Sequence, residues 1–210
     1  MADIPRLNGI IKQLEAGKTA ITTFSPAEIG NGVSLATSGY DGVIFEMEHN
    51  PFETKGLRDT LQFMLNRGQI VGGGTLAPQV TPIVRIPPNG SEMNQFLAKQ
   101  VLDVGVYGVV WPHVSTVEEA YNAVSASRYP RPLDRPYLEP RGQRGDAPVA
   151  AARYWGIGGQ EYYKRADVWP LNPEGEILVI IMCEEVKAIG NLDEMLKKVP
   201  GIGVVLIGEG

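Results

Sequence analysis

Short apolar runs alternate along the chain with amphipathic segments. Each run is nearly continuous in Val, Ile and Leu, as is typical of parallel strands that are covered on both faces. The alternation of such runs with helical segments predicts an α/β fold built on a parallel sheet. Six runs are predicted to form strands, over residues 19–25, 42–48, 81–87, 105–114, 176–184 and 201–208.

Helices are predicted between these strands. Ser115-Thr116-Val117-Glu118 matches a capping box for a helix that runs to about residue 126. Asn191 is predicted to begin another helix, which has lysines in its last turn and Pro200-Gly201 after its end. Two further helices are expected near residues 52–66 and 91–104.

This alternation suits both a doubly wound sheet and a (β/α)8 barrel, which is a TIM barrel. A dinucleotide-binding sheet would carry a glycine-rich turn directly after its first strand, where this chain has Ser25-Pro26-Ala27-Glu28. Gly72-Gly73-Gly74 precedes a strand and is interpreted as a flexible connection.

Residues 129–173, rich in Pro, Arg and Gly, are expected to add no strand. A complete barrel takes about 250 residues. We therefore expect a single barrel domain over residues 1–210 with about six strands, lacking its C-terminal part.

Composition narrows the class of protein. The chain is 43% hydrophobic and 20% charged, with 25 Gly and 16 Pro, which is typical of a globular domain with many turns. Its 24 acidic and 19 basic residues give a net charge of −5, and without a basic run this argues against nucleic acid as a partner.

Cys183 is the chain's one cysteine and cannot form an internal disulfide. The amino terminus has no long apolar run, so we expect a cytoplasmic protein without a membrane span.

Polar residues follow the predicted strands. In a parallel α/β fold, catalytic groups gather at the carboxyl ends of strands. Any one charged residue in that position is more often simply solvated, but their coincidence over several strands predicts a site. In chain order these residues are Glu46, Glu48, His49, Arg85, His113, Glu184 and Glu185.

Arg85 is the most informative of them individually. It lies within Pro82-Ile83-Val84-Arg85-Ile86-Pro87, where an unpaired charge would be costly. A substrate carboxylate or enolate would suit its planar guanidinium, and an internal salt bridge with Glu46 or Glu48 is the alternative. No lysine ends a strand, which argues against an imine mechanism. Carboxylates beside an arginine suit Mg²⁺ or Mn²⁺ better than zinc.

Several motifs together resemble one family of enzymes. They are Phe45-Glu46-Met47-Glu48-His49-Asn50-Pro51, Pro82-Ile83-Val84-Arg85-Ile86-Pro87, Gly108-Val109-Val110-Trp111-Pro112-His113, Arg128-Tyr129-Pro130, Glu184 with Asn191-Leu192-Asp193-Glu194, and Val205-Leu206-Ile207-Gly208. The chain resembles the metal-dependent class II pyruvate aldolases of the 4-hydroxy-2-oxoheptanedioate aldolase and macrophomate synthase type. The resemblance implies a (β/α)8 barrel, a homo-oligomer that is usually a hexamer, and a divalent cation such as Mg²⁺, Mn²⁺ or Co²⁺.

The resemblance also implies roles for individual residues. His49 is similar to the catalytic base, and Glu46 to the acid that orients its imidazole. Arg85 is similar to the pyruvate-binding arginine, Glu184 to a metal-binding carboxylate, and the Gly210 amide to a group that holds the pyruvate carboxylate. The family's second metal ligand is an Asp that would be residue 211. The chain departs from the family pattern at Glu46 (usually Asp), Met182 (often Gln) and Glu209 (usually Pro).

The expected reaction is reversible aldol cleavage of a 4-hydroxy-2-oxo acid to pyruvate and an aldehyde, with oxaloacetate decarboxylation as a side activity. The expected partners are small 2-oxo acids and aldehydes, with neither nucleic acid nor membrane. One alternative is a citrate-lyase-β-like enzyme acting on acyl-CoA thioesters, against which the Glu46 and His49 pair argues. Another is a non-catalytic barrel that binds oxo acids.

Overall fold

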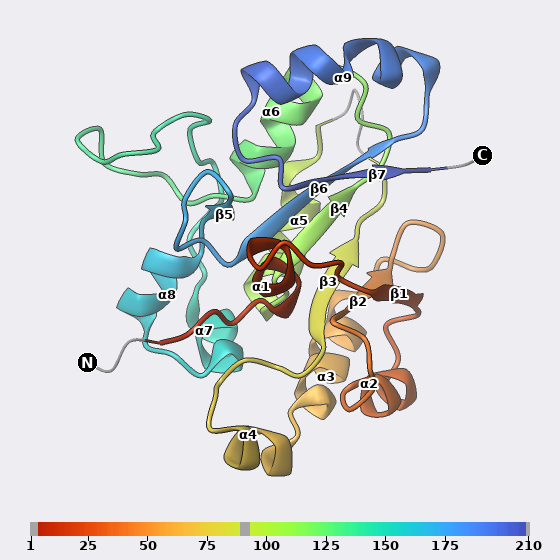
Figure 1. Ribbon diagram of the computed structural model, residues 1–210, viewed down its shortest axis with the longest axis vertical. Helices are drawn as coiled ribbons and strands as arrows, with labels where there is room; N and C mark the ends of the chain where they lie inside the picture. Colours follow the sequence, from red (N-terminus) through yellow and green to blue (C-terminus); the bar gives the residue numbers. More distant parts are fainter. Residues whose placement is uncertain (1–3, 89–92, 209–210) are drawn as a thin grey trace.

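A parallel sheet forms the centre of the molecule, which is described by a computed structural model over residues 4–88 and 93–208. Within these residues seven strands occur in the order β1-β2-β3-β4-β6-β5, and β7 pairs with β6 (Figure 1). Every strand pair is parallel, which confirms the expected α/β class. The strands are β1 (Thr22–Ser25), β2 (Gly42–Glu46), β3 (Thr81–Arg85), β4 (Gly108–Trp111), β5 (Val168–Trp169), β6 (Ile177–Cys183) and β7 (Val204–Ile207).

The central strands are buried along their whole length. All five residues of β2 and all seven of β6 are buried, as their unbroken apolar runs require. Helices follow the strands and cover the sheet (Figure 1). They are α1 (Gly9–Glu15), α2 (Ile29–Leu35), α3 (Thr54–Met64), α4 (Arg67–Gly73), α5 (Gln95–Val104), α6 (Val117–Ala126), α7 (Val149–Trp155), α8 (Gly159–Arg165) and α9 (Val186–Lys198). Among the described residues, no helix is long and apolar enough to cross a bilayer.

The sheet stays open at β1 and β7, each of which pairs with one neighbour in the described part of the chain. Side chains from β2, β3, β6 and β7 line an apolar cavity of about 260 Å³ together with residues of α1. An open parallel sheet around an apolar interior is compatible with the expected barrel.

The stretch 129–173 was expected to contain no strand, and this prediction is wrong. It includes α7, α8 and the two-residue strand β5, which pairs with the start of β6 through Val168 and Ile177. Two residues are too few to produce a hydrophobic period, so the sequence pattern could not reveal this strand.

Three local predictions also need correction. The capping box of α6 lies one residue later than expected and pairs Thr116 with Glu119. Helix α9 begins at Val186, before the expected start at Asn191, because Glu185 is already the extended residue that precedes the helix. The glycine triplet ends α4, and Gly74 closes that helix at a φ of 60°. Helix α3 lies within the range expected for it, whereas the expected start of the next helix at residue 91 falls outside the described residues.

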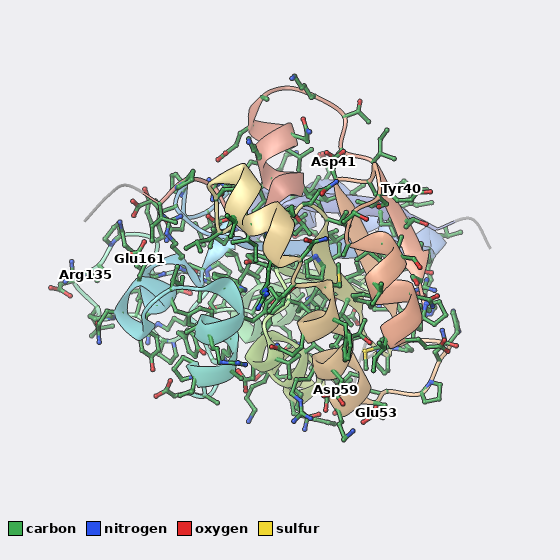
Figure 2. All side chains as sticks on the ribbon, turned by 90° about the horizontal axis from the view of Figure 1, so that it is seen from below. Tyr40, Asp41, Glu53, Asp59, Arg135 and Glu161 are labelled. Atoms are coloured by element: carbon green, nitrogen blue, oxygen red, sulfur yellow. The ribbon has the colours of Figure 1, made fainter. Side chains whose placement is uncertain are left out.

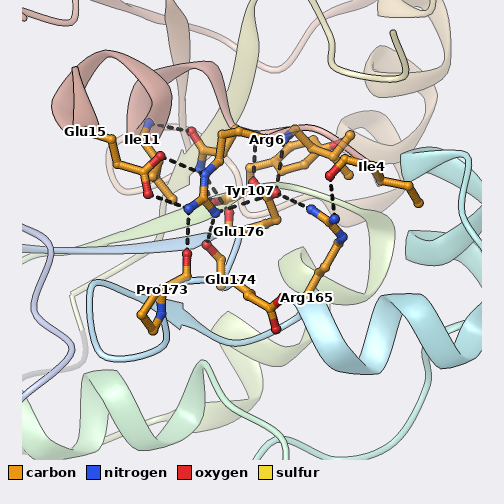
Figure 3. A network of polar contacts seen from close by, with 12 residues as sticks. Ile4, Arg6, Ile11, Glu15, Tyr107, Arg165, Pro173, Glu174 and Glu176 are labelled. Atoms are coloured by element: carbon orange, nitrogen blue, oxygen red, sulfur yellow. Dashed lines mark hydrogen bonds and ion pairs between the residues drawn. The ribbon is translucent and has the colours of Figure 1, made fainter. Parts of the chain in front are cut away.

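Buried ionic contacts hold the amino ends of the strands (Figure 3). Glu176 is fully buried and accepts hydrogen bonds from the backbone N–H groups of Leu7 and Asn8 at 3.0 and 2.8 Å. Arg165 donates to the same carboxylate at 3.0 Å. This network attaches the N-terminal segment to the amino end of β6. Asp41, before β2, and Glu53, beyond its carboxyl end, lie on opposite sides of the molecule in Figure 2. Glu176 precedes β6 and Glu184 follows it, so the anchor lies at the amino ends of the strands and the candidate site residues at the carboxyl ends.

Candidate active site

Glu46 and Arg85 meet across neighbouring strands. They are the last residues of β2 and β3, and the strand register places them directly opposite each other. The Arg85 Nε atom lies 2.6 Å from Glu46 Oε2, which Arg85 Nη2 also contacts. Arg85 Nη1 lies 3.1 Å from Glu48 Oε2. The internal salt bridge that the sequence left open as an alternative is therefore formed, and it includes both carboxylates.

The second oxygen of Glu46 binds the turn that follows β2. Glu46 Oε1 accepts the backbone N–H groups of Glu48 and His49 at 2.8 and 3.1 Å. The carboxylate that was expected to orient the imidazole thus binds the His49 backbone instead. The imidazole Nε2 lies 3.6 Å from Glu48 Oε2, and the side chain is 73% exposed. Glu48 is therefore the acid beside the candidate base.

Glu48 is the residue whose importance the sequence reasoning underrated. Its side chain is 3% exposed, and its Oε2 atom accepts no hydrogen bond from any described residue. The sequence held a signal for this, because the strand predicted over residues 42–48 would place Glu46 and Glu48 on the same face, although β2 itself ends at Glu46.

His113 and Glu184 extend the group from β4 and β6. The backbone N–H of His113 donates to Glu184 Oε2 at 3.0 Å. The imidazole of His113 lies between carboxylates, with Nδ1 3.3 Å from Glu185 Oε1 and Nε2 3.8 Å from Glu48 Oε1. Both histidines of the chain therefore lie beside Glu48.

Close packing positions the remaining side chains of the site. A Cβ atom on Gly208 would lie 2.7 Å from Glu184 Cγ, so the glycine at the end of β7 makes room for this carboxylate. The sulfur of Met182 lies 3.9 Å from Arg85 Nη1. Met182 is one of the three departures from the pattern of the family that the sequence resembles. The ring of Phe24 lies 4.8 Å from the Arg85 guanidinium. Gly210, expected to bind a substrate carboxylate, lies outside the described residues.

Comparison with known proteins identifies the family. Residues 26–210 match the model of the HpcH/HpaI aldolase/citrate lyase family. The chain belongs to this family. It is 34% identical over 188 residues to the 2-keto-3-deoxy-L-rhamnonate aldolase of Salmonella paratyphi B, a match that covers 89% of this chain and 56% of that protein. The corresponding protein of Klebsiella pneumoniae is 34% identical over 174 residues, covering 82% of this chain and 53% of its own length. The chain thus spans just over half the length of these curated relatives.

Solved structures share the fold. An HpcH/HpaI aldolase/citrate lyase family protein from Burkholderia cenocepacia superposes with a TM-score of 0.72 at 24% identity, covering 96% of this chain and 68% of that one. Macrophomate synthase superposes with a TM-score of 0.63 at 22% identity, covering 99% of this chain and 66% of the other. The expected relationship to the aldolases is confirmed at the level of the family.

The two carboxyl groups that pair with Arg85 have opposite pKa shifts. Burial by itself raises the pKa of Glu46, but the hydrogen bonds from Arg85 and from the His49 and Glu48 backbone outweigh burial and lower it below its usual value. Burial also raises the pKa of Glu48, where the opposing charges of Arg85 and His49 are offset by repulsion from Glu184 and Glu46. The pKa of Glu48 therefore lies above its usual value, whereas that of Glu46 lies below its usual value.

Replacing Glu48 with glutamine is expected to raise the melting temperature at pH 7.5 by more than at pH 4. An acid whose pKa is raised by folding destabilises the fold as the pH rises above its unfolded pKa, and the penalty is complete above the folded pKa. Below both values the carboxyl is neutral in either state, so glutamine gains little there. Thermal unfolding followed by circular dichroism from pH 4 to 7.5 measures the difference. Glu118→Gln, on the exposed face of α6, is the control, and an equal shift at both pH values would contradict the assignment.

The donor chemistry of the site fits a hard divalent cation. Glu184 and Glu48 offer carboxylate oxygens, the ligands that Mg²⁺ and Mn²⁺ prefer, and one Glu48 oxygen is buried without a hydrogen bond from the described residues. The two carboxylates are close enough for the charge of Glu184 to raise the pKa of Glu48. Within residues 4–88 and 93–208, however, no group of three or more His, Cys, Asp or Glu side chains is arranged to hold a metal ion. Glu184 and Glu48 would form part of such a site.

Proposed function

We propose that this chain carries the pyruvate half-site of a divalent-metal-dependent aldolase. The reaction is the reversible cleavage of a 4-hydroxy-2-oxo acid to pyruvate and an aldehyde. The observation that carries the proposal is the Arg85 guanidinium, held by Glu46 and Glu48 at the carboxyl ends of β2 and β3, with Glu184 on the same edge of the sheet. Similarity to 2-keto-3-deoxy-L-rhamnonate aldolases supports it.

Arg85 is positioned to stabilise negative charge on the substrate. Its side chain is 15% exposed, and two carboxylates and the Phe24 ring fix the orientation of its guanidinium. A donor already in place for developing charge needs little reorganisation during the reaction, which is the property that stabilises an enolate. Glu184 and Glu48 would hold the divalent cation, which supplies a Lewis acid for the oxo group when bound.

His49 is the proposed base for the C4 hydroxyl of the substrate. Its exposed imidazole can reach a bound molecule or a bridging water, and its Nε2 atom lies 3.6 Å from Glu48 Oε2. In the cleavage direction His49 accepts the hydroxyl proton, the C3–C4 bond breaks, and the bonding electrons become the pyruvate enolate. Glu46 acts on His49 through the backbone of the turn.

Replacing His49 with alanine is expected to lower aldol cleavage by about 10²–10⁴-fold while oxaloacetate decarboxylation falls much less. Decarboxylation produces the same enolate but removes no hydroxyl proton, so it needs the base less. Both rates are measured on the same preparation, by coupled detection of pyruvate, with and without EDTA. Equal losses in the two reactions would show that His49 shapes the site or binds substrate instead.

The same assay separates the alternatives. An acyl-CoA lyase would turn over a thioester and leave pyruvate and aldehyde untouched. A non-catalytic binding protein would bind oxalate, an analogue of the pyruvate enolate, without turnover of any substrate. A hexameric assembly, which the family resemblance implies, and a cytoplasmic location are part of the same proposal.

A further inference from the structure

The turn after β4 is attached to the start of α9 by three side chains. Ser115 Oγ donates to Glu185 Oε2 at 3.1 Å, and Asn191 Nδ2 donates to the Ser115 carbonyl at 2.8 Å. The other oxygen of Glu185 lies 3.3 Å from His113 Nδ1. The residues Ser115, Glu185 and Asn191 are called the clasp below.

The clasp is not needed to build the helices on either side. Glu185 occupies the position before α9, yet its side chain makes no capping hydrogen bond to that helix. Asn191 lies inside α9, where asparagine has a weak helix propensity, and its amide reaches across to the turn. Helix α6 is capped separately, by Thr116 and Glu119. The polar groups of Glu185 and Asn191 therefore serve the connection between the two segments.

The turn to which the clasp binds has an uncommon backbone conformation at its central residue. His113 has a φ of 55°, in the left-handed region that non-glycine residues seldom adopt. Such a residue persists only where its surroundings hold it there. In this conformation the His113 N–H donates to Glu184 Oε2, and a Cβ atom on Gly208, directly after β7, would lie only 2.7 Å from Glu184 Cγ. Glu184 is thus confined between a backbone donor and a glycine.

We infer that Ser115, Glu185 and Asn191 are positioning residues for Glu184, acting through the backbone N–H of His113. The clasp holds the turn after β4 in place, and the turn directs the His113 N–H towards Glu184. The hydrogen bond from this N–H orients the Glu184 carboxylate. This inference rests on the proposed function, because it assigns the clasp a role only if Glu184 binds the cation.

The test measures the affinity of the 210-residue chain for Mn²⁺ by water-proton relaxation. Asn191→Ala and Glu185→Ala are expected to raise the Kd by about 10-fold to 100-fold, the usual effect of removing a partner that orients a metal ligand. Their melting temperatures should stay near that of Asp193→Ala, a control on the same helix whose side chain is 87% exposed. At saturating Mn²⁺, kcat should recover, because the clasp does not touch the reacting atoms.

Glu185→Gln separates geometry from charge. Glutamine keeps the length of the side chain and an oxygen that accepts the Ser115 hydroxyl, so this variant should retain most of the Mn²⁺ affinity that Glu185→Ala loses. If Glu185→Gln weakens Mn²⁺ binding as much as Glu185→Ala, the charge of Glu185 matters and the positioning role is wrong.

Glu184→Gln distinguishes the clasp from the proposed function. If this variant binds Mn²⁺ like the unmodified chain, Glu184 is not a ligand, and both the proposed metal site and the clasp are wrong. If Glu184→Gln loses Mn²⁺ while Asn191→Ala and Glu185→Ala bind it as Asp193→Ala does, only the clasp is wrong.

Discussion

Turnover of pyruvate with an aldehyde is expected to fall about 10²–10³-fold when Arg85 is replaced by lysine, the usual loss for one preorganised donor to developing charge. The Arg85 guanidinium reaches Glu46 through Nε and Nη2 and Glu48 through Nη1. A single ammonium cannot occupy these positions together, so lysine keeps the charge and loses the fixed orientation. Stability should change little, because a positive charge remains between the two carboxylates.

Two further variants make this expectation specific. Arg58→Lys, a surface substitution on α3, should leave both turnover and melting temperature unchanged. Arg85→Met leaves Glu46 and Glu48 without their cation, and breaking a buried pair in this way typically costs about 3–5 kcal/mol of stability. If Arg85→Lys unfolds the protein while the folded fraction turns over normally, Arg85 is a structural ion-pair partner and not a substrate-binding residue.

The grouping of the candidate site residues could be predicted from the sequence because it depends on where the strands end. Long buried runs such as β6 fix where a strand stops, and in a parallel sheet all strands stop at the same edge. Glu46, Arg85, His113 and Glu184 therefore came together as expected.

The sequence offered an ion pair of Arg85 with Glu46 or Glu48 as an alternative, but it could not show that both carboxylates take part. The position of Glu46 directly opposite Arg85 follows from the register of β2 against β3, and the pattern of either strand alone does not define that register. The sequence also does not reveal that the turn after β2 directs the His49 backbone towards Glu46 and its imidazole towards Glu48.

Long-range polar contacts also explain the incorrect start predicted for α9. Asn191 looks like a helix start because asparagine commonly caps helices, yet its amide binds the carbonyl of Ser115, 76 residues earlier in the chain. The sequence around Asn191 indicates only whether its side chain can form hydrogen bonds with nearby backbone groups. It carries no information about a partner on another βα unit.

Glu184→Gln is expected to abolish metal-dependent turnover and leave the fold intact. Glutamine has nearly the same shape, so it can still accept the N–H of His113 and pack against Gly208. Its neutral amide oxygen is a much poorer partner for a divalent cation than a carboxylate. The loss should therefore appear in turnover and in Mn²⁺ affinity, with little change in the circular dichroism spectrum or the melting temperature.

Glu184→Asp provides the matched comparison, because it keeps the charge but moves it back by one methylene. If the position of the carboxylate matters as much as its charge, Glu184→Asp should also lose most activity, and excess Mn²⁺ should restore part of it. Glu118→Gln, an exposed acid on α6, controls for the change in net charge. Full turnover by Glu184→Gln would refute the ligand assignment. The hydrogen bond from the His113 N–H to Glu184 would then have only a structural role, joining the end of β6 to the turn after β4.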